Sequence, residues 1–172
     1  MILLINKSIV ALKIQVAIGY DPIEFNTFIN EAQEFDFKPL VLEEFYFDLL
    51  SKKDLAAWKK LIDGGNYTYE NREYQFQGIS TVLSYFAFAR FKMDSSAVST
   101  SHGFVVKTNP NSTPLGLDER KNAYYRKREE ANLIMLDVIK FIERNLVDYP
   151  SWKNSECSLT KNNYAPITRV IQ

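Results

Sequence analysis

Hydrophobic residues recur at three- and four-residue spacing over most of the chain, which indicates amphipathic helices. The clearest helix start is at Asp21, a capping residue that is followed by Pro22 at the first helical position and then by Glu24. This pattern predicts a helix to about Asp36, a second helix after the Pro39 turn, and a third that stops at the glycine pair 64–65. The apolar positions of the first helix are Phe25, Phe28, Ile29, Ala32 and Phe35.

Two further helices are predicted in the second half of the chain. Residues 79–93 carry apolar side chains around most of the helical circumference and no charge before Arg90, which is typical of a central core helix. The longest helix runs from the cap Asp118 to about Val147. It has two apolar surfaces: Ala131, Met135, Val138, Ile142 and Leu146 form one, and Leu133, Leu136 and Ile139 form the other. We expect the second surface to contact another subunit.

Four segments depart from the helical period. Residues 8–18 alternate apolar and polar side chains, which favours a half-buried strand in an extended N-terminal arm, with a helix from residue 9 as the alternative. Residues 66–78 indicate a loop or hairpin. Residues 94–117 are rich in Ser, Thr, Asn, Pro and Gly and predict a protruding loop or two-stranded arm. The last 22 residues indicate an extended tail.

These patterns together predict a mainly α fold, a small helical bundle. The expected organisation is an extended N-terminal arm over residues 1–20, a helical bundle domain over residues 21–149 with a long loop or β-hairpin arm at 94–117, and an extended C-terminal tail over residues 150–172. The chain of 172 residues is long enough for one domain, and it shows neither an internal repeat nor a second-domain boundary.

The aromatic content is high, at 14%, with 12 Phe, 10 Tyr and 2 Trp. A small domain has limited interior for so many large rings, so we expect some of them at protein–protein contacts. A well-packed core that absorbs the rings is the alternative. Lys plus Arg (21) equals Asp plus Glu (21), so the overall charge does not steer the chain toward nucleic acid or an acidic membrane.

The sequence offers little catalytic chemistry. Cys157 and His102 are the only cysteine and histidine, which excludes an internal disulfide and falls short of a zinc ligand set. Phosphate-binding glycine motifs and calcium-binding loops are missing. We therefore expect neither an enzyme nor a cofactor or metal site. Lys7 and Lys13 interrupt the apolar N-terminus, which argues against a signal peptide or a membrane span and for synthesis in the cytosol.

A basic–aromatic cluster lies at the start of the longest helix. Its members are Arg120, Lys121, Tyr124, Tyr125, Arg126, Lys127 and Arg128. Such mixtures can bind nucleic acid, so a small DNA-binding regulator that uses residues 118–130 is an alternative function. Acidic residues flank the cluster and can neutralise it through pairs within the helix. A solvated or subunit-facing helix surface is therefore favoured. The flanking residues are Asp118, Glu119, Glu129 and Glu130.

Three phrases of the sequence carry a resemblance to a known family. FINEAQEFDFKPLVLEEFYFDLL reads as a helix end, a Pro-Leu turn and an aromatic helix, YQFQGISTVLSYFAFARF follows the glycine pair, and SHGFVVK precedes the long charged helix. Over residues 20–152 the chain resembles a family of mostly uncharacterised proteins from phages and prophages of Bacteroides-type bacteria, including crAss-like phages. Members of that family are regarded as head-to-tail connector proteins, the adaptor ring below the portal.

The resemblance implies a structural virion protein that links the portal to the tail. Its expected partners are copies of itself in a ring of about twelve, the portal protein, and tail or further ring proteins, because each ring subunit contacts two neighbours through different surfaces. Non-specific contact with packaged DNA and a role as another neck or tail completion protein stay open. Such a protein would be assembled in the host cytoplasm and would reside in the virion neck, without a membrane. The expected partner-binding residues are Phe104, Val105, Val106, Tyr124, Tyr125, Trp152, Tyr164, Ile167 and Val170.

Overall fold

The computed structural model describes residues 2–16, 19–95, 97–100, 103–106 and 115–152, and it confirms the mainly α class. The α-helices are α1 (Lys7–Lys13), α2 (Pro22–Glu31), α3 (Glu43–Lys52), α4 (Ala56–Asp63), α5 (Gly78–Asp94) and α6 (Leu117–Arg144). A π-helix η1 (Ala32–Phe37) and two 3-10 helices, η2 (Lys38–Leu40) and η3 (Pro150–Trp152), complete the helical elements. The strands are β1 (Gly65–Tyr69), β2 (Arg72–Phe76), β3 (Ala97–Thr100) and β4 (Gly103–Val106).

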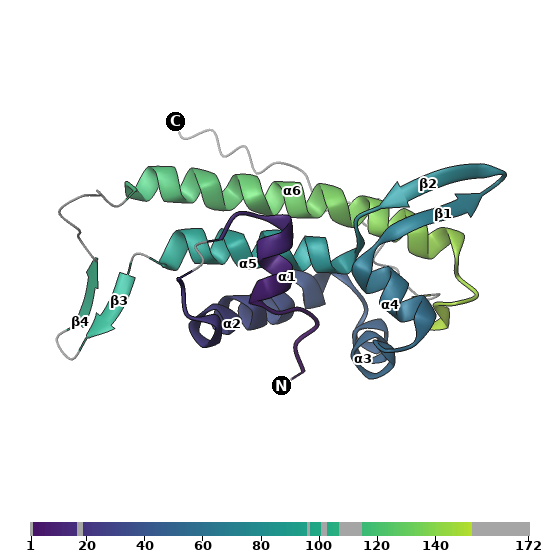
Figure 1. Ribbon diagram of the computed structural model, residues 1–172, viewed down its shortest axis with the longest axis horizontal. Helices are drawn as coiled ribbons and strands as arrows, with labels where there is room; N and C mark the ends of the chain where they lie inside the picture. The colour runs from purple at the N-terminus through teal and green to yellow at the C-terminus, as the bar shows by residue number, and fades with distance from the viewer. Residues whose placement is uncertain (1, 17–18, 96, 101–102, 107–114, 153–172) are drawn as a thin grey trace, which may run out of the picture.

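Helices α5 and α6 run antiparallel along the long axis of the molecule and form its spine (Figure 1). Helix α5 is buried over most of its circumference, as the absence of charge before Arg90 predicts. Helix α6 covers one side of α5, while α1, α2, α4 and η1 pack on other sides of it. The α6 residues Ala131, Met135, Val138 and Ile142 are fully buried. The core of the bundle therefore lies along α5.

Residues 7–13 are helical, so the predicted strand is wrong; the alternative, a helix, is right, although it begins at Lys7 and not at residue 9. Asn6 caps α1 by accepting a hydrogen bond from the backbone N–H of Ile9 (3.0 Å). Val10 is then buried while Leu12 points to solvent, because the helical period separates two residues that a strand would place on one face. The preceding residues are also anchored in the bundle: the buried Gln33 side chain accepts from Leu4 N and donates to Ile2 O, both at 3.0 Å.

Helix α2 begins as the sequence predicts, with Asp21 accepting from Ile23 N (2.6 Å) and Glu24 N (3.1 Å). Its continuation differs, because residues 32–37 form the π-helix η1. The wider π turn shifts the phase of the following side chains. Phe35, which the sequence assigns to the apolar face, is exposed, and Asp36 is buried instead.

The predicted hairpin after the glycine pair is formed by β1 and β2. Its two turn residues, Glu70 and Asn71, both have positive φ angles (48° and 62°), which suits a tight two-residue turn. Gly64 ends α4 with φ 83°, and Gly78 opens α5 with φ 76°. A Cβ at Gly78 would lie 2.4 Å from Gly64 N, so the two glycines allow α4 and α5 to approach closely.

The segment at 94–117 contains a second antiparallel hairpin, β3 with β4, which projects from the end of the spine opposite to the β1–β2 hairpin (Figure 1). This confirms the two-stranded arm. Helix α6 begins at Leu117, one residue before the predicted cap Asp118, and ends at Arg144, three residues before the expected end.

Most aromatic rings of the described residues are buried in the core or packed against it. The aromatic content therefore reflects a well-packed core, which is the alternative to rings at protein–protein contacts. Among the described side chains, the exposed aromatic ones are Phe35, Phe47 and Tyr125. Phe76 stacks on Phe141 with ring centroids 3.9 Å apart, and other rings meet edge to face. Excess ring surface therefore does not by itself require a partner.

Candidate interaction surfaces

The side of α6 that faces away from α5 carries three large exposed side chains. Tyr125 is 66% exposed, Leu133 is 60% exposed and Leu136 is 37% exposed. Spacings of eight and three residues place them on one side of a helix, and we call this trio the outer face of α6. The sequence predicts Leu133, Leu136 and Ile139 as a second apolar surface, and the structure exposes the two leucines but buries Ile139.

A buried ion network fixes α6 to the rest of the bundle. The Asp36 side chain is only 2% exposed and accepts from Arg90 Nε (2.6 Å), from Arg90 Nη2 (3.1 Å) and from Arg128 Nη1. Arg90 also pairs with Glu31 (3.1 Å). Burial by itself lowers the pKa of Arg90, but the hydrogen bonds and the charge of Asp36 outweigh it and raise that pKa. The network joins η1, α5 and α6, so it holds the outer face in a fixed orientation.

The basic cluster at the start of α6 is largely engaged within the chain. Arg128 binds Asp36, Lys127 pairs with Glu130 (2.5 Å), and Arg120 donates to the carbonyl of Met93 (3.0 Å). The Lys127 pair is of the kind that the sequence predicts within the helix, whereas the Asp36 partner is distant in sequence. These contacts reduce the charge that residues 118–130 can offer to nucleic acid.

Apart from Trp152, the predicted partner-binding residues fall into three groups. Phe104, Val105 and Val106 form most of β4 in the projecting hairpin. Tyr125 lies on the outer face of α6, but its neighbour Tyr124 turns inward and accepts a hydrogen bond from Arg128 Nη1 (3.1 Å). Tyr164, Ile167 and Val170 lie outside the described residues, as do Cys157 and His102.

Trp152 requires a correction, since the sequence places it in a tail that binds partners. It is 4% exposed and packs edge to face on Phe45, with ring centroids 4.8 Å apart. Its neighbour Tyr149 donates from its hydroxyl to Ala57 O (2.8 Å) and packs on Trp58. Residues 149–152 therefore close the core at the α3–α4 end, and Trp152 offers no surface to another protein.

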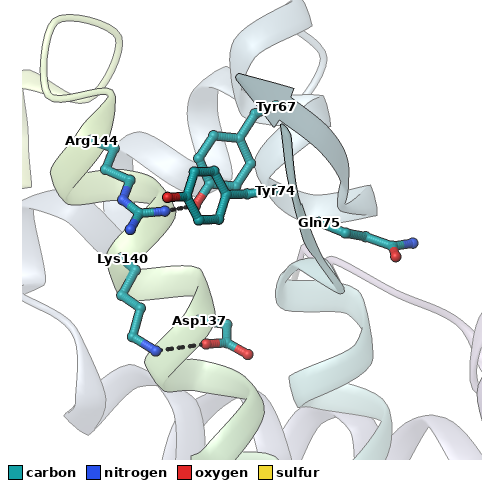
Figure 2. A pocket seen from close by; sticks show the side chains of 6 residues that line it. All are labelled: Tyr67, Tyr74, Gln75, Asp137, Lys140 and Arg144. Carbon is teal, nitrogen blue, oxygen red and sulfur yellow. Dashed lines mark hydrogen bonds and ion pairs between the residues drawn. The ribbon is translucent and has the colours of Figure 1, made fainter. Parts of the chain in front are cut away.

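A small pocket between the β1–β2 hairpin and α6 was not predicted from the sequence. Figure 2 shows the Arg144 side chain directed at Tyr67 and Tyr74, with Lys140 and Asp137 further along the same helix. Arg144 Nη1 donates to the Tyr67 hydroxyl (2.7 Å), and its guanidinium carbon lies 4.2 Å from the ring centroid of Tyr74. Desolvation lowers the pKa of Arg144, but the bond to Tyr67 and the nearby tyrosine hydroxyls outweigh it and raise that pKa.

The tyrosine pattern of the hairpin contains the signal that could have located this pocket. Tyr67, Tyr69, Tyr74 and Phe76 share one face of the hairpin because side chains of a strand alternate and Tyr67 pairs with Tyr74. Arg144, in contrast, stands at the end of a helix with nothing in its sequence neighbourhood to single it out.

The pocket is too small for a typical cofactor. Its volume of roughly 180 Å³ is below the 300 Å³ or more that ligand pockets usually have. Within the described part of the chain, no group of three His, Cys, Asp or Glu side chains could hold a metal ion. None of the helices there is long and apolar enough to cross a membrane.

Comparison with known proteins gives one family. The model of a family of unknown function, DUF6712, matches residues 37–162, which is nearly three quarters of the chain and includes α3 to α6. Neither a curated protein nor a solved structure matches the chain. Because the match spans well over half of the sequence, the chain belongs to the DUF6712 family.

Proposed function

We propose that this protein is a structural virion subunit of a tailed phage, a head-to-tail connector that forms an adaptor ring between the portal and the tail. The observation that carries the proposal is the outer face of α6. Tyr125, Leu133 and Leu136 are exposed on a helix whose opposite side is fully buried. Large apolar side chains on a rigid, unshielded helix surface are typical of protein–protein interfaces.

The buried ion network around Asp36 adds rigidity to this surface. A ring subunit must present two different surfaces at a constant angle, because the rotation between neighbours has to close the ring. The outer face of α6 supplies one candidate surface. The β3–β4 hairpin, which projects from the far end of the spine, supplies the second (Figure 1). We expect β4 residues 104–106 to contact a neighbouring copy or the portal.

The remaining parts of the proposal follow from this role. The chain would act without catalysis and without a cofactor, would assemble in the host cytoplasm, and would reside in the virion neck. Its partners would be about twelve copies of itself around the portal axis, the portal protein, and tail or further ring proteins. The equal numbers of acidic and basic residues (21 each) favour protein partners over tight DNA binding.

The test is assembly with the portal protein encoded in the same phage or prophage genome. Mass measurement and negative-stain imaging of the two purified proteins together should reveal a ring on the portal. The double variant Leu133→Asp with Leu136→Asp should stay folded and fail to assemble, because it places charges on the outer face. Leu12→Asp is the matched control, since Leu12 is 84% exposed on α1 and lies off the outer face, and this variant should assemble normally.

A wild-type chain that remains a monomer and ignores the portal at every concentration would overturn the proposal. Salt-sensitive binding to duplex DNA in place of assembly would point to the regulator alternative. Deleting residues 155–172 tests the tail separately: we expect weaker assembly and an intact bundle, because Trp152 and the core that it closes are retained. Normal assembly of this truncation would exclude the tail from the interface.

A further inference from the structure

Three arginines on helices α5 and α6 differ in the kind of group that they contact. Arg90 and Arg128 share the buried carboxylate of Asp36, and Arg90 also pairs with Glu31, so two carboxylates balance the two arginines. Arg144 has no such partner: among the described residues, no carboxylate forms an ion pair with it. Instead its guanidinium lies beside the rings of Tyr74 (4.2 Å) and Tyr69 (4.8 Å). Arg144 is therefore held in place by neutral aromatic groups.

Aromatic stacking leaves most of the hydrogen-bonding capacity of Arg144 unused. A guanidinium has five N–H donors in a planar fork, and within the described part of the chain the Arg144 side chain gives one hydrogen bond, to the Tyr67 hydroxyl (2.7 Å). Stacking on tyrosine faces orients the plane while the edge of the fork remains available. The side chain is thus positioned before any partner arrives, which reduces the entropy lost on binding.

The surroundings of the fork define what it can accept. The pocket holds roughly 180 Å³, the scale of one side chain, and its walls are Tyr67 and Tyr74 (Figure 2). Lys140 stands nearby but pairs with Asp137 (2.9 Å), so these two charges cancel. Arg144 is left as the one cation of the pocket lining that a ligand must neutralise. A single negative charge on a small planar group matches this arrangement.

We propose that the Arg144 pocket is a receptor for one carboxylate, the side chain of an aspartate or glutamate on a protein segment that binds across the hairpin and the end of α6. A carboxylate can take two parallel N–H bonds from the fork, and the neighbouring tyrosine ring holds the guanidinium in place for this geometry. Nucleic acid fits less well, because a run of phosphates needs several cations and the pocket lining offers one that is not paired with a carboxylate. The inference goes beyond the proposed function, since it specifies ligand chemistry for any partner.

The test uses the full chain and short fluorescent peptides in anisotropy titrations. The probe is a peptide with a central glutamate between leucines and blocked ends, and its control carries glutamine at that position. A phosphoserine peptide and an oligothymidine supply the phosphate arms. We expect the glutamate peptide to bind at least about tenfold more tightly than the glutamine peptide, because a charge-assisted hydrogen bond replaces a neutral one.

Three variants test whether the preference for the glutamate peptide depends on Arg144. Arg144→Met should abolish the preference for glutamate, and Arg144→Lys should weaken binding by several fold, because it keeps the charge and loses the fork. Lys121→Met removes an exposed cation from the other end of α6 and should bind as the wild type does. If the methionine variant fails to fold, the lysine variant decides.

Equal binding of the glutamate and glutamine peptides would overturn the inference, as would tighter binding of phosphoserine or oligothymidine, or no saturable binding at all. These outcomes are separable from failure of the proposed function. A chain that forms rings on the portal and ignores glutamate would retain the connector role and lose the carboxylate pocket. A chain that binds glutamate and never assembles would show the reverse.

Discussion

Replacing Trp152 with alanine tests whether this residue belongs to the core of the bundle. Trp152 is 4% exposed, so nearly all of its side chain is removed from water on folding. A tryptophan buries up to about 250 Å², which at about 25 cal/mol per Å² corresponds to roughly 6 kcal/mol as an upper bound. Large-to-small substitutions of buried aromatic residues usually cost about 3–5 kcal/mol. We expect Trp152→Ala to lower the free energy of unfolding by about 4 kcal/mol.

Urea unfolding followed by far-ultraviolet circular dichroism measures this change without relying on tryptophan fluorescence. With a slope of about 2 kcal/mol per molar urea, the midpoint should fall by about 2 M. Tyr125→Ala is the matched control: Tyr125 is an aromatic residue that is 66% exposed, and its loss should change stability by no more than about 0.5 kcal/mol. If Trp152→Ala lowers the free energy of unfolding by less than about 1 kcal/mol, the reasoning is refuted, and Trp152 is again a candidate for contact with a partner.

Three further predictions concern other parts of the bundle. Asp36→Asn should lower the free energy of unfolding by about 2 kcal/mol, which is less than for a fully buried pair because Arg90 and Arg128 are both partly exposed. The control Asp137→Asn should change it by less than about 0.5 kcal/mol. Equal effects of the two variants in urea unfolding would contradict this prediction. Burial and then the hydrogen bond to Glu34 raise the pKa of Tyr46 to about 12. The folded chain therefore keeps this proton after the unfolded chain has lost it, so stability should fall as pH rises from 10 to 12. Unfolding midpoints measured across that range should fall less in Tyr46→Phe, and identical pH dependence would rule out this origin. Gly78→Ala should cost at least about 3 kcal/mol, because its φ is positive and a Cβ would meet backbone. Gly19→Ala, with nothing within 4 Å of the added Cβ, should be tolerated, and similar melting temperatures for the two variants would contradict the close approach.

The engagement of the basic cluster shows how tertiary contacts change the meaning of a local pattern. Residues 118–130 combine basic and aromatic side chains, a composition that suits nucleic acid as well as a protein interface. In the folded chain Arg128 is bound to Asp36, which is 92 residues away in the sequence. That pairing depends on the π turn at residues 32–37, which brings Asp36 into the interior. No pattern within α6 itself could reveal that partner.

The sequence alone determined the parts of the protein that depend on local rules. Asp21 with Pro22 set the start of α2, the glycine pair 64–65 set the end of α4, and the apolar period identified α5 as the core helix. It also revealed the second apolar side of α6, since helical spacing fixes which side chains share a face. These features follow from neighbours within a few residues, so the printed order of the amino acids contains them.

The tertiary structure decided which surfaces remained open. Short apolar stretches fit either a strand or a helix, so only packing against α5 established that residues 7–13 are helical. Likewise, Trp152 became part of the core and Arg144 became the cation of a tyrosine pocket through contacts with residues far away in the chain. Burial and charge pairing are properties of the whole fold, because each depends on what occupies the space beside a residue, and sequence distance does not encode that occupancy.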